Sequence, residues 1–401
     1  MARFRKRAGA AVLGPPEHQL TIFERLETFT RRAEAPSPTR PAVRLFLCVL
    51  ALMGIGMLLQ ASHAATTLSP ADYKNEVTQQ AVYRLLGVGA ILFCARIGPQ
   101  GLRRFLPLLV VGVVVALICV WMPGIGEARN GSARWVALPL LNRTFQPSEL
   151  ARIVMVLWVA DRCTRLGPRL LDLRHGVGPV LGIGLFVMAL IGAETDLGGA
   201  LLFFLCFVST LYIGGARFWH SAGSAITVGG TAFVVGITFF DYIRRRVEIF
   251  LGVSENAQAS DAVRALGSGE YLGVGLGQGG FRNSGIPYQD SDYVFAMIGE
   301  ELGLAGTLLT LGLILAFVWF SLRMVLTIKS RYLALSAFGL LLSVSVQAML
   351  HMQVVTGLAP PKGMTLPFLS DGGTSLIVSS IAVGLALGAA RRTEDESPAT
   401  T

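Results

Sequence analysis

The chain has 401 residues, of which 53% are hydrophobic and 15% are charged. Soluble domains carry roughly 25% charged residues, and a water-soluble fold of this composition would leave too much apolar surface exposed. The same apolar excess excludes a disordered chain. The net charge of +9 does not indicate nucleic acid, because the basic residues lie at the N-terminus and between apolar runs, as the positive-inside rule describes. We expect an all-α polytopic membrane protein without a nucleic-acid partner.

The first 42 residues are rich in arginine and lack the apolar stretch of a cleaved signal. We expect a basic cytoplasmic tail, mostly disordered. The alternative is a short amphipathic helix over 21–32 that docks on the lipids of the membrane surface.

Apolar runs long enough to cross a bilayer, which takes about 20 residues, follow this tail. The sequence predicts about ten spans. They are 43–62, 81–98, 105–122, 147–163, 177–193, 197–215, 218–240, 300–323, 331–354 and 373–390. The second is the weakest because Arg84 lies inside it, and a second cytoplasmic tail follows at 393–401.

The segments between the spans alternate in charge. Basic residues occupy one set together with both termini, so we expect that side to be the cytoplasm. The opposite segments are 63–80, 123–146, 193–196, 241–299 and 355–372. The long one, between spans seven and eight, exceeds a simple connector, and long loops usually carry function. We therefore expect the chemistry at the outer face.

A first polar cluster joins 131–135 (Gly-Ser-Ala-Arg-Trp) to 145–152 (Phe-Gln-Pro-Ser-Glu-Leu-Ala-Arg). Glu149 and Arg152, three apart, can pair on one helical face. A helix cap with an intrahelical ion pair is one interpretation. A functional cavity is the other, because ionised groups inside a span are costly. Arg134 either anchors the loop or binds a phosphate.

Three more clusters lie on the outer side. Asp196 follows Glu194 at a helix start, where acids are favoured by the helix dipole, so a cap and a site role are both open. The glycine series 272–280 can cradle phosphates, but no strand precedes it and no Gly-Lys-Ser/Thr follows, so a turn or re-entrant segment is favoured. Carboxylates gather beyond it at Asp290, Asp292, Glu300 and Glu301. The last cluster, 363–375 beside Lys362, is either a plain helix-entry turn or a functional lip.

These clusters, in this order and spacing, resemble the SEDS family of peptidoglycan polymerases (FtsW, RodA and SpoVE) over about residues 43–392. The matching pieces are Gly131 through Trp135 with Phe145 through Leu150, Asp196-Leu197-Gly198, Gly267 through Gly277, Asp292 through Ala296 with Gly299 through Gly303, and Lys362 through Ser375. The Lys-Gly-x-Thr-Leu-Pro wording at 362–367 is closer to the division and sporulation branch than to the elongation branch.

The resemblance implies a glycosyltransferase in the bacterial cytoplasmic membrane that polymerises lipid II at the outer face. The family's essential carboxylate aligns with Asp292, which we expect to be the general base. Arg134 and Arg152 are expected at the pyrophosphate, with Glu149 orienting Arg152. Further headgroup candidates are Asp196, Lys362 and Ser370. The resemblance fixes no cofactor: the departing pyrophosphate needs either positive charge from the protein or a divalent cation, Mg²⁺ or Mn²⁺. A class B penicillin-binding protein is the expected partner.

Several positions depart from the usual family wording and indicate a divergent member. Glu194-Thr195 replaces Gln-Pro before Asp196, Asp371 replaces the Tyr of Ser-Tyr-Gly-Gly, and His351 stands where Asn is usual.

Two other functions remain open at the level of sequence. A lipid flippase or transporter would need intramembrane charges such as Arg84, Glu149, Arg152 and Glu300, although no inverted repeat is apparent. A non-catalytic activator of a penicillin-binding protein would act through helix contacts alone.

Overall fold

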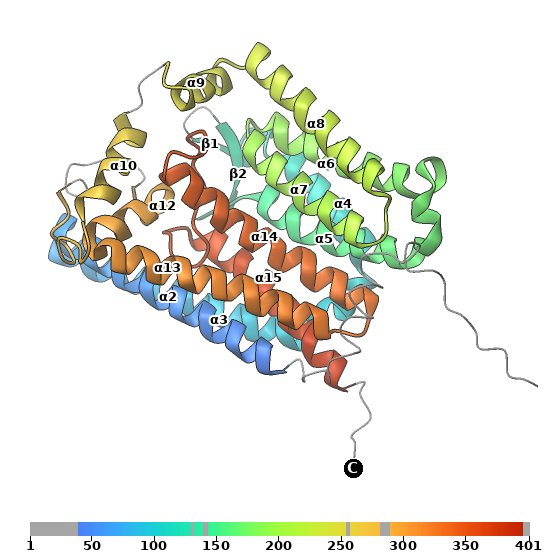
Figure 1. Ribbon diagram of the computed structural model, residues 1–401, viewed down its shortest axis with the longest axis horizontal. Helices are drawn as coiled ribbons and strands as arrows, with labels where there is room; N and C mark the ends of the chain where they lie inside the picture. Colours follow the sequence, from blue (N-terminus) through green and yellow to red (C-terminus); the bar gives the residue numbers. More distant parts are fainter. Residues whose placement is uncertain (1–38, 130–131, 139–142, 254–256, 281–288, 396–401) are drawn as a thin grey trace, which may run out of the picture.

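The computed structural model describes residues 39–129, 132–138, 143–253, 257–280 and 289–395. The predicted basic tail thus lies almost wholly outside the described residues. The helices are α2 (Thr39–Thr67), α3 (Pro70–Arg103), α4 (Leu106–Cys119), α5 (Pro147–Leu166), α6 (Gly178–Ala193), α7 (Leu197–Ile213), α8 (Phe218–Phe239), α9 (Asp241–Phe250), α10 (Ala257–Ser268), α12 (Gln289–Asp292), α13 (Val294–Thr327), α14 (Arg331–Val355) and α15 (Gly373–Asp395). Figure 1 shows the long helices as one bundle, with α9, α10 and α12 at one end and the C-terminus at the other.

The predicted polytopic membrane fold is confirmed. Within the described residues, seven helices are long and apolar enough to cross a bilayer, and α4 and α7 are shorter apolar helices. The charged helix α5 occupies the predicted span at 147–163. Every predicted span therefore coincides with a helix, while the count of ten membrane crossings stays a prediction.

The outer segment 63–80, predicted as a loop, is mostly helical. Helix α2 continues to Thr67, and α3 begins at Pro70. The side chain of Ser69 caps α3 by accepting a hydrogen bond of 3.3 Å from the backbone N–H of Asp72, and proline suits the first helical position. This start signal explains why the loop shrinks to a sharp turn.

The outer segment 123–146 adds a small β-sheet to the helical fold. Strands β1 (Gly126–Arg129), β2 (Ser132–Leu138) and β3 (Arg143–Phe145) pair antiparallel in the order β1-β2-β3. The sheet precedes α5 directly, so Arg134 on β2 is held close to the start of that helix.

The long outer segment 241–299 is not an irregular loop, because it contains α9, α10 and α12. Helix α13 already begins at Val294, so Glu300 and Glu301 lie inside a helix instead of at its entrance. The glycine series packs against this helix: the N–H groups of Val274 and Gly275 donate to the carbonyls of Glu300 and Glu301 at 2.9 and 3.1 Å.

Helices α3 and α15 pack closely through small residues. A Cβ on Gly384 would lie 2.6 Å from the backbone oxygen of Ile91, and one on Gly388 would lie 2.8 Å from that of Ala95. Small residues allow this approach between helices in a membrane. The packing holds the middle and the C-terminal part of α15 against α3.

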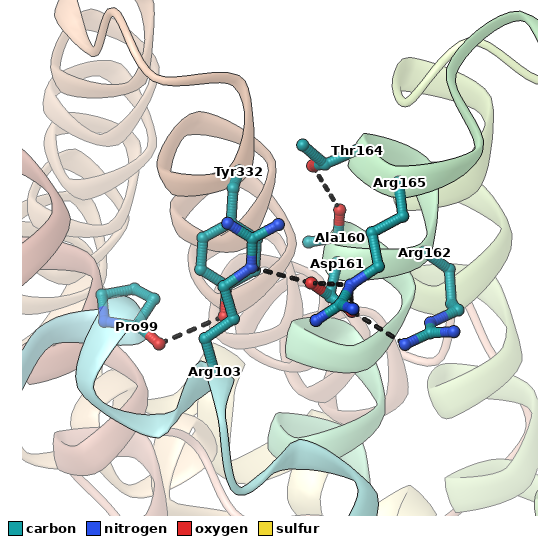
Figure 2. A network of polar contacts seen from close by, with 8 residues as sticks. All are labelled: Pro99, Arg103, Ala160, Asp161, Arg162, Thr164, Arg165 and Tyr332. Carbon is teal, nitrogen blue, oxygen red and sulfur yellow. Dashed lines mark hydrogen bonds and ion pairs between the residues drawn. The ribbon is translucent and has the colours of Figure 1, made fainter.

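A buried carboxylate connects helices at the far end of α5. Asp161, whose side chain is 1% exposed, lies within 3.0 Å of the guanidinium nitrogens of Arg103, Arg162 and Arg165. The guanidinium of Arg103 also lies over the ring of Tyr332, 4.4 Å from its centroid. Figure 2 shows these side chains converging from three helices. The cluster ties α3, α5 and α14 together.

Candidate active site

A cavity of about 590 Å³ lies at the end of the bundle where α5 and α7 begin. It collects six of the seven predicted site residues from five segments of the chain. They are Arg134 of β2, Glu149 and Arg152 of α5, Asp196 before α7, Asp292 of α12, and Lys362 of the segment 362–372. Ser370, the seventh, is absent from its lining among the described residues.

Asp292 is held at the wall of the cavity by its neighbours. The hydroxyl of Ser291 donates a hydrogen bond of 3.1 Å to Oδ1 of Asp292. On the other side, a Cβ placed on Gly363 would lie 2.6 Å from Oδ2, so only glycine lets the backbone approach this carboxylate. Burial raises the pKa of Asp292, although Ser291, Arg246 and Arg134 counteract it. A carboxyl with a raised pKa is a stronger base once ionised.

Ser370 has a structural place next to this carboxylate. Its hydroxyl donates to the backbone carbonyl of Ser291 and accepts from the backbone N–H of Leu366, both at 2.7 Å. It therefore fixes the segment 362–372 to α12.

Asp196 is the centre of a second cluster. Its Oδ1 lies 3.7 Å from Nζ of Lys362 and 3.8 Å from Nη1 of Arg134. The same carboxylate accepts from the N–H of Gly199 at 2.9 Å and from the amide of Gln146 at 3.3 Å. Asp196 thus caps α7, which confirms one of its two predicted roles. It also pairs with two cations at the wall of the cavity, and its role in substrate binding stays a prediction.

Burial and neighbouring charges shift the pKa values of Lys362 and Asp196. The pKa of Lys362 is lowered to about 8, chiefly by burial. Asp196 acts to raise this pKa, and the nearby arginines act to lower it. For Asp196, burial acts to raise the pKa, but Lys362 and Arg134 together hold it below its usual value. At neutral pH the cluster therefore carries an ionised acid and an excess of positive charge.

The predicted ion pair between Glu149 and Arg152 does not form in the described structure. Instead Nη2 of Arg152 donates to Oε1 of Gln347 at 2.8 Å. The amide of Gln347 then donates to the carbonyl of Thr365 at 3.0 Å. Arg152 is thereby tied to α14 and to the segment 362–372 at the cavity wall.

Sequence reasoning gave no role to Arg246, which lines the cavity from α9. Its charge opposes the raised pKa of Asp292 and lowers that of Lys362. The signal was present: Arg244-Arg245-Arg246 is a basic run on the side that the positive-inside rule leaves poor in cations. We refer to Arg134, Arg246 and Lys362 as the basic side of the cavity.

The residues offer few ligands for a metal ion. Within the described part of the chain, no three His, Cys, Asp or Glu side chains gather as a metal site. The acids of the cavity are spread over its wall instead.

Comparison with known proteins shows the family of the chain. The family described as Cell cycle protein, which comprises FtsW, RodA and SpoVE, matches residues 41–395. A probable peptidoglycan glycosyltransferase FtsW from Geobacter metallireducens is 31% identical over 87% of this chain and 94% of its own. Stage V sporulation protein E from Bacillus subtilis is 31% identical over 88% and 98%.

Solved structures share the fold. A chain from a peptidoglycan synthase complex has a TM-score of 0.72 at 23% identity and covers 88% of this chain and 98% of its own. The rod shape determining protein RodA from Thermus thermophilus has a TM-score of 0.63 at 21% identity over 86% and 95%.

Proposed function

Because this chain belongs to the FtsW/RodA/SpoVE family, we propose that it is a membrane glycosyltransferase that polymerises lipid II into peptidoglycan strands. The observation that carries the proposal is the cavity, which is lined by the half-buried carboxylate of Asp292 together with the basic side. A glycosyl transfer that expels a diphosphate needs a base for the acceptor and positive charge for the leaving group.

Asp292 supplies the base. The acceptor sugar hydroxyl attacks the anomeric carbon of the lipid-linked donor, and the carboxylate of Asp292 takes the hydroxyl proton as the new glycosidic bond forms. Ser291 and Gly363 hold the carboxylate in place, so little reorganisation is needed during the reaction.

The basic side stabilises the leaving group. As the bond between the anomeric carbon and the diphosphate oxygen breaks, negative charge grows on the diphosphate, and Arg134 and Lys362 are close enough to each other, through Asp196, to share it. Arg152 adds a further positive charge at the wall. The charge is worth more in a buried site than in water.

We propose that a divalent cation, Mg²⁺ or Mn²⁺, enters with the diphosphate. Mg²⁺ commonly binds through one or two carboxylates and substrate phosphates, which suits a wall without a three-acid cluster among the described residues. It would neutralise charge on the diphosphate, and the roles of the side chains above do not depend on it.

The multi-pass fold places the protein in a membrane, and we propose the bacterial inner membrane with both termini in the cytoplasm and the cavity outside. We also propose a class B penicillin-binding protein as partner. The likeness to a chain from a peptidoglycan synthase complex supports this.

The experiment is a polymerisation assay. Purified protein, with and without the penicillin-binding partner, is incubated with labelled lipid II and Mg²⁺ or Mn²⁺, and the products are separated by chain length. A ladder of glycan strands is expected. If glycan strands form through the activity of the partner alone, this protein is a non-catalytic activator. If it moves lipid II across the membrane of vesicles and forms no glycan strands, it is a flippase.

A further inference from the structure

Asp371 is an acid of the cavity that the mechanism above does not use. It lines the same space as Asp292 and the basic side. It belongs to the turn that leads into α15, and a Cβ on the neighbouring Gly373 would lie 2.5 Å from the ring of Tyr83. The turn therefore sits directly on α3, and the position of Asp371 is fixed by that helix.

The amide of Gln80 orients the carboxylate. Nε2 of Gln80 donates to Oδ1 of Asp371 at 2.7 Å, and it also donates to Oε1 of Glu76 at 2.9 Å. Gln80 is 2% exposed, so this hydrogen bond is partly shielded from water and is stronger than one at the surface.

The buried side chain of Arg84 contacts Gln80. Its Nη1 donates to Oε1 of Gln80 at 2.9 Å, and its Nε donates to the carbonyl of Met53 at 3.0 Å. The residue is 6% exposed, and it forms no ion pair with any residue that the structure describes. The amide of Gln80 thus links a buried cation to the carboxylate of Asp371, and the two charges offset one another across it.

The wall of the cavity thus carries two kinds of charged group, the cations of the basic side and the carboxylate of Asp371. At the basic side, cations exceed acids, so an anionic diphosphate is attracted there. A fixed carboxylate at Asp371 repels a diphosphate and accepts hydrogen bonds from hydroxyl and amide N–H groups. The cations and the carboxylate of Asp371 therefore suit different parts of one ligand, its diphosphate and its hydroxyl or amide donors.

We propose that Asp371 is a specificity-determining residue that binds hydroxyl or amide donors of the sugar–peptide half of the substrate, and so directs the diphosphate toward the basic side. The inference rests on the proposed function for the identity of the substrate. Gln80 and Arg84 are positioning residues, since they act through the carboxylate of Asp371 and do not line the cavity.

The test measures equilibrium binding to the purified full-length protein in detergent, which needs no turnover. Two ligands are compared: lipid II, and undecaprenyl diphosphate, which lacks the sugars and peptide. Asp371→Asn should weaken the binding of lipid II about 10-fold, the effect of losing one hydrogen bond to a charged group. It should not weaken the binding of undecaprenyl diphosphate. Lys362→Gln is expected to weaken both ligands. Glu76→Gln, which also alters a partner of Gln80 but does not line the cavity, is the matched control.

A purely structural effect is separated by a double variant. Asp371→Asn leaves Arg84 without its counter-charge, and Arg84→Gln combined with it restores the balance. The proposal expects lipid II binding to stay weak in the double variant. Recovery to the wild-type affinity would show that the carboxylate acts only through Arg84 and would overturn the proposal, as would equal weakening of both ligands or no weakening. A wild-type protein that binds lipid II but makes no glycan strands would refute the proposed function. The comparison of lipid II binding between wild type and variants would still test the role of Asp371.

Discussion

The hydroxyl of Ser370 donates a hydrogen bond of 2.7 Å to the backbone carbonyl of Ser291, the residue before Asp292. Residues 79 positions apart in the chain are thereby joined at the wall of the cavity. Ser370, expected at the substrate headgroup, instead positions the segment that carries the base.

Replacing Ser370 with alanine should therefore slow catalysis without removing a substrate contact. The change leaves the carbonyl of Ser291 and the N–H of Leu366 without a side-chain partner, a loss of about 1–3 kcal/mol for each buried group. We expect a lower kcat with KM nearly unchanged, measured with labelled lipid II. Ser379→Ala is the control, because the hydroxyl of Ser379 is buried without a partner in the described structure. A rise in KM alone would return Ser370 to the headgroup.

The rate of polymerisation should depend on pH with two limbs. Asp292 must be ionised to accept a proton, and burial raises its pKa, so activity should fall on the acid side at a higher pH than for an ordinary carboxyl. Lys362 must be protonated to stabilise the leaving group, and its pKa is about 8, so activity should fall as pH rises through that value. Initial rates across pH test both limbs.

Lys362→Arg isolates the alkaline limb. An arginine stays protonated far above pH 8, so the fall near that value should move upward while the acid limb stays in place. An alkaline limb that remains at the wild-type pH would assign it to a group other than Lys362.

Glu194, between α6 and α7, should be replaceable by glutamine. Burial chiefly, and then Asp196, raise its pKa from 4.5 to about 8, and neither carboxylate oxygen has a hydrogen-bond partner in the described structure. The folded state therefore favours the protonated form. The contribution of the protonated carboxyl to the free energy of unfolding is fully present below pH 4.5. It is lost progressively as pH rises from 4.5 to 8.

The variant Glu194→Gln removes this loss. Thermal unfolding in detergent should show wild type and variant alike near pH 4.5, and the variant more stable by a margin that grows as pH rises toward 8. Equal pH dependence of the two proteins would show that folding does not raise the pKa of Glu194.

Asp161→Asn should destabilise the bundle without touching the cavity. The substitution leaves the three arginines of Figure 2 around a neutral side chain, and breaking a buried ion cluster costs about 3–5 kcal/mol. A lower unfolding temperature is expected. Asp172→Asn is the control, because its carboxylate is 54% exposed, pairs with His175 and accepts a hydrogen bond of 3.0 Å from the backbone N–H of Arg174. Equal unfolding temperatures for both variants would contradict a stabilising role.

The membrane fold and most of the site were predictable, because the length of each apolar run and the order of the motifs are visible in the sequence itself. Each predicted span coincides with a helix, and six predicted residues line one cavity. The helical turn at Ser69 was not predicted, because the apolar pattern weakens there while a cap still starts α3. The small sheet before α5 was missed for a related reason: three short strands leave little periodic signal.

The side-chain partners were less predictable, since they depend on tertiary packing. Glu149 and Arg152 have the spacing of an ion pair, yet Gln347 of a distant helix takes the guanidinium of Arg152. Arg246 reaches the cavity only because α9 folds back over it. The pairing of Asp371 with Gln80 joins positions 291 apart, which no local pattern contains.

The central claim is that Asp292 is the base of a glycan polymerase, and one comparison tests it most directly. Wild type, Asp292→Asn and Asp241→Asn are assayed with labelled lipid II and the partner protein, after each is shown to be folded by thermal unfolding. Asp241 is an exposed acid on the same outer segment. A ladder of strands from wild type and Asp241→Asn, and none from Asp292→Asn, is the result that we predict. Undiminished strands from a folded Asp292→Asn protein would contradict the mechanism.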